Sequence, residues 1–105
     1  MRFIIFGAFM ALLAPTAQAA DIEAGQKLAR QCSVCHGKQG IARDPEVPHL
    51  AGQSSLYLEK AIKDFRDGHR EDRRMTLAVK NLTDEEIRNL AAYYEAFEIQ
   101  VVAPE

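Results

Sequence analysis

Two cysteines and a histidine form the most informative motif of this chain. Cys32 and Cys35 are separated by two residues, and His36 follows directly, in the order Cys32-Ser33-Val34-Cys35-His36. This C-x-x-C-H order is the signature of covalent haem attachment. Each thiol can add to one haem vinyl group, and the short spacer lets one helical turn reach both while His36 points at the iron. We therefore predict one covalently attached haem c per chain.

Other uses of the two cysteines fit the sequence less well. A disulfide between Cys32 and Cys35 would close a very short loop, and the stabilisation from a crosslink falls as the loop shrinks. A zinc site needs four ligands, and the separation of His49 and His69 does not match the usual second ligand pair. A thiol oxidoreductase would place the motif beside a βαβ pattern, and no alternating run of β-branched residues lies near it.

Residues 1–20 have the features of a secretory signal peptide. A positively charged start precedes an apolar run over residues 3–13, and a small-residue cleavage signal ends at Ala19. The apolar run is shorter than the ~20 residues that cross a bilayer, so an uncleaved membrane anchor is the less favoured alternative. Cleavage after Ala19 or Ala20 would leave a mature domain over 21–105, exported to the periplasm and without stable membrane insertion.

Length and charge narrow the function classes. The chain has 105 residues, with 13 Lys and Arg against 15 Asp and Glu and a formal net charge of −2. This mild acidity argues against a nucleic acid partner. A mature domain of about 85 residues is small for a self-sufficient hydrophobic core. A covalently held haem would supply the missing apolar mass.

Hydrophobic periodicity predicts an all-α fold with three main helices. The expected elements are a first helix that starts after Asp21 and runs into Cys32, a second over 55–67 that stops at Gly68, and a last helix over 84–98. The start of the last helix is the clearest, because Thr83 and Glu86 match a capping box.

The segment over residues 37–53 is predicted to be an irregular loop. Pro45 and Pro48 exclude a regular helix there. Its length suits a segment that wraps the haem on the His36 side. His49 could compete as an iron ligand, but a single loop histidine is more often solvated.

A charge run of both signs follows the second predicted helix, over residues 67–74. Its usual interpretation is a solvated loop, and His69 is interpreted in the same way. Alternatively, one of three arginines pairs with a haem propionate or contributes to a docking surface: Arg70, Arg73 or Arg74.

Met75 is the methionine that remains once the leader is removed, because Met1 and Met10 lie within it. If a thioether completes the iron coordination, Met75 must supply it. A single methionine in a small domain is usually core filler. Its expected position in a flexible polar loop, well after His36, favours the ligand interpretation.

In this order the motifs resemble the small class I cytochromes c of bacteria, especially single-haem proteins similar to one domain of a cytochrome c4 or to the c553 type. The matching segments are 32–37, 48–53 with Tyr57, 65–70, Met75, 82–87 and 90–94. They cover nearly all of the mature chain. The resemblance implies a cytochrome c fold whose three main helices and loops wrap around one covalently attached haem.

The resemblance also implies a role for individual residues. Cys32 and Cys35 would be the thioether anchors, His36 the proximal ligand and Met75 the distal ligand. Pro48 falls where these proteins place the proline whose carbonyl accepts the N–H of the proximal histidine, and Leu50 where they place a haem-packing leucine. The two-haem arrangement of the cytochromes c4 is not implied, because the chain has a single C-x-x-C-H and no internal repeat.

His/Met ligation fills both axial positions, which leaves no open site for dioxygen or peroxide. We therefore expect an electron carrier with a relatively high potential, not an enzyme. Its partners would be a respiratory donor and a terminal oxidase or reductase, docking briefly at the exposed haem edge. Two alternatives stay open: a haem subunit or domain that serves one specific enzyme, and a haem peroxidase or gas-binding protein if Met75 is not a ligand.

Overall fold

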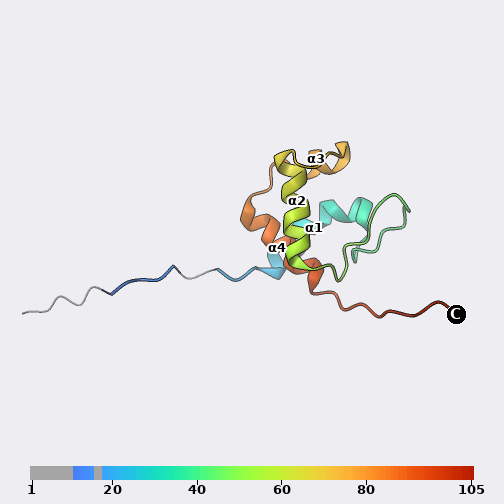
Figure 1. Ribbon diagram of the computed structural model, residues 1–105, viewed down its shortest axis with the longest axis horizontal. Helices are drawn as coiled ribbons and strands as arrows, with labels where there is room; N and C mark the ends of the chain where they lie inside the picture. The colour runs from blue at the N-terminus through green and yellow to red at the C-terminus, as the bar shows by residue number, and fades with distance from the viewer. Residues whose placement is uncertain (1–10, 16–17) are drawn as a thin grey trace, which may run out of the picture.

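The computed structural model describes residues 11–15 and 18–105 (Figure 1). The described residues form helices and loops without a strand, which confirms the all-α prediction. The helices are α1 (Ile22–His36), α2 (Ser55–Asp67), α3 (Arg73–Val79) and α4 (Asp84–Glu95). None of them is long and apolar enough to cross a membrane. The predicted leader falls largely on residues 1–10 and 16–17, which lie outside the described residues.

The two terminal helices of the domain, α1 and α4, make the most extensive helix contact. A Cβ added at Gly25 of α1 would lie 2.1 Å from the backbone oxygen of Asn89 in α4 and 3.0 Å from the Tyr93 Cβ. No side chain fits in this space, so a glycine lets the two backbones approach each other. The Asn89 side chain then accepts a hydrogen bond of 2.8 Å from the Asp21 N–H, just before α1.

The predicted capping box begins α4 as expected. Thr83 accepts a hydrogen bond from the Glu86 N–H, and the Glu86 carboxylate accepts one from the Thr83 N–H. Leu82 and Ile87, which flank the cap, are both buried. These two residues complete the hydrophobic staple that fixes how the chain enters α4.

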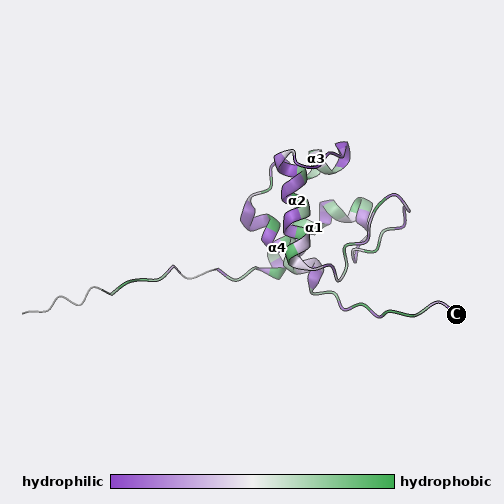
Figure 2. Ribbon diagram, viewed as in Figure 1, coloured by the Kyte–Doolittle hydropathy of each residue, from purple (hydrophilic) through white to green (hydrophobic). Residues whose placement is uncertain are grey.

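Helix α2 packs against both α3 and α4 and closes the core. Hydrophobic residues alternate with hydrophilic residues along α2 and α4 in Figure 2, as expected for helices with one buried face. The buried core residues are Ala29, Leu58, Phe65, Val79, Leu82, Ile87, Leu90, Ala91 and Tyr94. Arg66 links α2 to the start of α4, because its guanidinium donates to the Leu82 carbonyl (3.1 Å) and to the Asp84 carboxylate (2.7 Å).

Helix α3 was not predicted, so the description of Met75 as part of a flexible polar loop is wrong. The Asp72 carboxylate accepts hydrogen bonds from the Arg74 N–H (2.9 Å) and the Met75 N–H (3.0 Å), which starts a helix inside the predicted loop. The mixed charges around Asp72 obscured this cap in the sequence. Two other boundaries also differ: α1 continues through the whole motif to His36, and α4 ends at Glu95.

The close crossing of α1 and α4 predicts that Gly25→Ala destabilises the protein. The added methyl group would meet the backbone of α4, which cannot move like the end of a flexible side chain, so we expect a loss of about 1–3 kcal/mol in the free energy of unfolding. Chemical denaturation of the haem-loaded protein measures this value. Gln26→Ala, at an exposed position of the same helix, is the matched control, and an equal effect of the two substitutions would contradict the crossing argument.

Candidate haem site

One cavity is lined by all the residues that the sequence predicts to be functional. It has a volume of about 360 Å³, within the ~300–1,000 Å³ typical of small-molecule and cofactor sites. All six predicted site residues line it: Cys32, Cys35, His36, Pro48, Leu50 and Met75. Apolar side chains from three helices complete the walls, among them Leu58, Ile62, Phe65, Val79 and Leu90.

Cys32 and Cys35 lie one helical turn apart on α1, so both side chains reach the same side of the helix. Both are free cysteines, and they differ in exposure: Cys32 is half-buried and Cys35 is exposed. Burial raises the pKa of the Cys32 thiol, while an interaction with the Tyr94 hydroxyl acts in the opposite direction. One thiol therefore faces the core and the other faces solvent.

His36 is the last residue of α1 and is almost fully buried. Its Nδ1 lies 2.9 Å from the Pro48 carbonyl oxygen. Because a carbonyl oxygen can only accept, this hydrogen bond places the proton on Nδ1 and leaves the Nε2 lone pair free. A histidine held in this way by its other ring nitrogen is the usual arrangement for a metal ligand.

The loop over residues 37–53 is held to the helices by backbone hydrogen bonds. The Gly40 carbonyl accepts from the Leu50 N–H (2.7 Å) and the Ala51 N–H (3.1 Å), and the Gly52 N–H donates to the Tyr94 carbonyl (2.9 Å). These bonds fold the loop back on itself and fix its end to α4. Pro48 and Leu50 are thereby kept at the wall of the cavity.

His49 has a structural contact that sequence reasoning missed. Its Nδ1 accepts a hydrogen bond of 2.9 Å from the Ala42 N–H, across the same loop. The side chain is exposed, as predicted for a solvated histidine. No sequence signal identifies such a contact, because it depends on how the loop folds.

Helix α3 brings Met75 to the cavity, where it packs partly buried against the core. Two of the three arginines of the charge run also line the cavity. The Arg70 guanidinium lies 4.5 Å from the centroid of the Phe65 ring, and Arg74 lies 3.9 Å from the Asp72 carboxylate.

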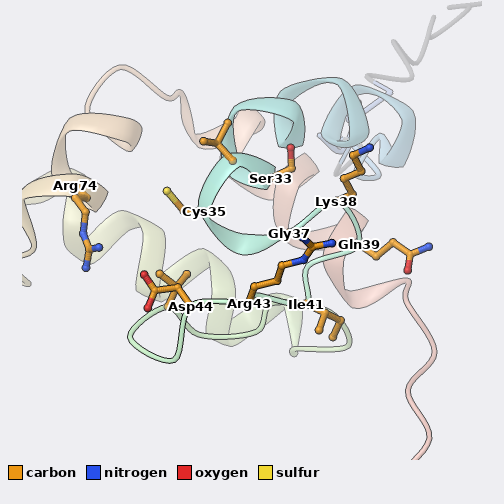
Figure 3. Close-up of a pocket in the computed structure, with 11 residues that line it drawn as sticks. Ser33, Cys35, Gly37, Lys38, Gln39, Ile41, Arg43, Asp44 and Arg74 are labelled. Carbon is orange, nitrogen blue, oxygen red and sulfur yellow. The ribbon is translucent and has the colours of Figure 1, made fainter.

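A second, more open hollow of about 830 Å³ adjoins the motif at Cys35. Figure 3 shows Cys35, Arg74 and Asp44 around the same open space, with Arg43 and Lys38 farther along the loop. Three cations and one carboxylate line this hollow: Lys38, Arg43, Arg74 and Asp44. Of these cations only Arg74 is a candidate from the sequence, because the spacing of the other two gives no signal.

The cavity fits a covalently bound haem. It is largely apolar, two thiols enter it from one helical turn, and the neighbouring histidine has one ring nitrogen free. The profile of the family described as cytochrome c matches residues 22–96. This chain belongs to the cytochrome c family. It therefore carries one covalent c-type haem through Cys32, Cys35 and His36, as predicted.

Individual relatives agree with this family. The chain is 40% identical over 83 residues to cytochrome c4 of Pseudomonas aeruginosa, an alignment that covers 79% of this chain and 41% of that protein. It is 42% identical over 83 residues to cytochrome c-554(548) of Halomonas halodenitrificans, covering 76% of this chain and 100% of that protein. The chain thus spans about two fifths of this cytochrome c4 and all of the smaller relative.

A solved structure and an enzyme subunit extend the comparison. Reduced recombinant cytochrome c4 from Pseudomonas stutzeri has a TM-score of 0.69 at 28% identity, covering 79% of this chain and 53% of that chain. The cytochrome subunit of sulfide dehydrogenase from Chlorobaculum tepidum is 36% identical over 70 residues, or 67% of this chain and 63% of that protein. The resemblance to single-haem class I cytochromes c is confirmed, and the family is one of electron-transfer proteins.

The cap of α3 predicts that the stability of the folded protein depends on pH. Hydrogen bonds from the backbone, first from Met75, lower the pKa of Asp72. A carboxyl whose pKa is lower in the folded state stabilises it above the unfolded pKa of about 4, and this contribution is lost as the pH falls through the folded value. We expect Asp72→Asn to keep the cap and to lose part of this acid sensitivity. Asp72→Ala should lose the cap and be less stable at pH 7 as well.

Denaturation of the haem-loaded variants at several pH values measures both effects. Asn and Ala form the matched pair, because only Asn can accept the two backbone hydrogen bonds. Identical behaviour of the two variants at pH 7 would contradict the assignment of Asp72 as the cap.

Proposed function

We propose that this chain is a periplasmic one-electron carrier whose haem iron is ligated by His36 and Met75. The observation that supports it is that α1 and α3 deliver these two side chains to one cavity, together with both cysteines of the motif. Met75 and His36 are far apart in the sequence, and they belong to different helices. A ligand pair is the simplest chemical reason for this convergence.

The surroundings of each proposed ligand support its role. The Pro48 carbonyl holds the His36 ring and leaves Nε2 for the iron. The Asp72 cap fixes the first turn of α3, which carries Met75. Leu50 is partly buried against the core and adds apolar lining beside the same cavity.

With His36 and Met75 as its two ligands, the bound haem would supply a reversible one-electron iron couple and would leave no open site for a substrate. The apolar walls disfavour the more highly charged oxidised iron, and a thioether sulfur favours the reduced ion. Both effects support a relatively high potential.

The proposed location rests on the predicted signal peptide at residues 1–20, which would direct the protein to the periplasm. There the partners would be a respiratory donor and a terminal oxidase or reductase. Residues 21–105 would form the mature cytochrome c domain. A fusion of residues 1–20 to a periplasmic reporter would test this proposal by its export.

A second candidate is a haem subunit that serves one specific enzyme. The names of two relatives support it, the cytochrome subunit of sulfide dehydrogenase and a thiosulfate dehydrogenase electron acceptor from Stutzerimonas stutzeri. A permanent subunit would co-purify with its enzyme at fixed stoichiometry, whereas a mobile carrier would be recovered alone. A haem peroxidase or gas-binding protein, the third possibility, needs an iron position that Met75 does not occupy.

Met75→Ala tests the distal ligand. We expect the variant to lose the near-infrared sulfur-to-iron band and to show a lower midpoint potential, by on the order of 0.1 V or more, since axial ligands set haem potentials over ~0.8 V. Leu77→Ala, at an exposed position of the same helix, is the control for any general effect on α3. An unchanged band and potential in Met75→Ala would overturn the assignment and favour the peroxidase or gas-binding alternative.

We expect small redox ions to approach the haem through the hollow beside Cys35. Lys38 and Arg43 give this entrance a positive character although the chain as a whole is acidic. Replacing both by Glu should slow oxidation of the reduced protein by anionic hexacyanoferrate(III), roughly tenfold at low salt, because steering by surface charge is strong there. Stopped-flow measurements over a range of salt concentrations give the rates.

Replacing both Lys27 and Arg30 by Glu is the matched control, because these two exposed cations of α1 line neither hollow and the change in net charge is the same. If this control slows the reaction as much as the substitution of Lys38 and Arg43 does, only net charge matters and the Cys35 entrance has no special role.

A further inference from the structure

Tyr94 carries a buried hydroxyl group that the proposed ligation does not use. The residue is 2% exposed, and its hydroxyl has no hydrogen-bond partner among the described residues. Leaving a buried polar group without a hydrogen-bond partner is unfavourable. A phenylalanine would fill the same place without that disadvantage, so the hydroxyl calls for a partner in the haem-loaded protein.

The position of this hydroxyl is fixed by its surroundings. The Tyr94 ring packs against Tyr93 (5.1 Å between centroids) and Phe97 (6.5 Å). On another side it meets Gly40, where an added Cβ would lie 3.0 Å from a ring carbon. The Tyr94 carbonyl also accepts the hydrogen bond from the Gly52 N–H. Both the ring and its backbone are therefore anchored, which leaves the hydroxyl little freedom.

Cys32 is the reactive group that this hydroxyl influences. Both residues line the haem cavity. The hydroxyl counteracts the effect of burial on the pKa of the Cys32 thiol. In turn the pKa of Tyr94 is raised, first by burial and then by Cys32. The two groups are therefore neighbours in the cavity, although the hydroxyl makes no hydrogen bond to the free thiol.

Haem attachment changes the hydrogen-bonding capacity of the Cys32 sulfur. A free thiol has a weak S–H donor and a weak acceptor, but a thioether sulfur keeps only its acceptor character. Once the thioether forms, a hydroxyl beside it can only donate. The chemistry of the attachment thus determines the direction of the O–H dipole.

We infer that the Tyr94 hydroxyl donates to the Cys32 thioether sulfur in the mature protein and thereby favours the reduced state of the haem. The inference rests on the covalent haem of the proposed function. The positive end of the O–H dipole would then lie at a sulfur that is one carbon away from the macrocycle, where it would stabilise an added electron. Tyr94 is in this sense a positioning residue, because it acts on the haem through Cys32.

Tyr94→Phe removes the hydroxyl and keeps the ring. At a fixed redox potential of the solution, we expect the ratio of reduced to oxidised protein to fall roughly three- to tenfold. This is the effect expected from the loss of one hydrogen bond. A tenfold change corresponds to about 59 mV for one electron. The carbon–sulfur stretching band of the thioether, followed by resonance Raman spectroscopy, should shift as well. Tyr93→Phe is the matched control, one residue away on the same helix, and should change neither quantity.

Each outcome decides the inference. An unchanged potential or an unchanged carbon–sulfur band in Tyr94→Phe overturns it, and so does an equal response of Tyr93→Phe. If Tyr94→Phe does not mature, the unmodified protein is refolded in D2O, and a carbon–sulfur band identical to that in H2O overturns the donation. Failure of the proposed ligation is seen separately, as a missing near-infrared sulfur-to-iron band in the unmodified protein.

Discussion

The close crossing of α1 and α4 is the contact on which the rest of this structure depends. At Gly25 the two backbones approach so closely that no Cβ fits between them. Beyond this point α1 continues to the motif that ends at His36, while α4 supplies Leu90 and Tyr94 to the same cavity. The distance between the helices at the crossing therefore sets how far apart two walls of the haem site lie.

The loop over residues 37–53 completes this frame without regular secondary structure. It is tied to α1 through the hydrogen bond between His36 and Pro48, and to α4 through that between Gly52 and Tyr94. An irregular segment of this length is normally mobile. Here residues near its C-terminal end, Pro48 and Gly52, are bound to the two crossing helices, so His36 is held by both helix and loop. In the proposed ligation, this attachment of His36 would keep the rearrangement small when an electron arrives.

Much of the fold and the covalent part of the site could be predicted from the sequence, because local signals specify them. The motif at 32–36, the capping box at Thr83 and the apolar stripe of α4 each involve residues within a few positions of one another. Helix α3 was missed because the Asp72 cap lies among other charges. The contacts of His49 and Tyr94 could not be found, since each depends on segments that meet only in the folded chain.

The two cysteines of the motif lie in unequal surroundings, and this asymmetry explains how one small domain can both protect a haem and exchange electrons with it. Cys32 is half-buried at the wall of the haem cavity, where low polarity strengthens each electrostatic interaction. Cys35 is exposed and borders the positively charged hollow. We therefore expect interactions at the buried edge to have the larger effect on the preference for the reduced state. At the exposed edge water screens them, so surface charge there affects the rate of encounter more than the equilibrium. The potential and the choice of partner can therefore change independently through substitutions on opposite sides of the same helical turn.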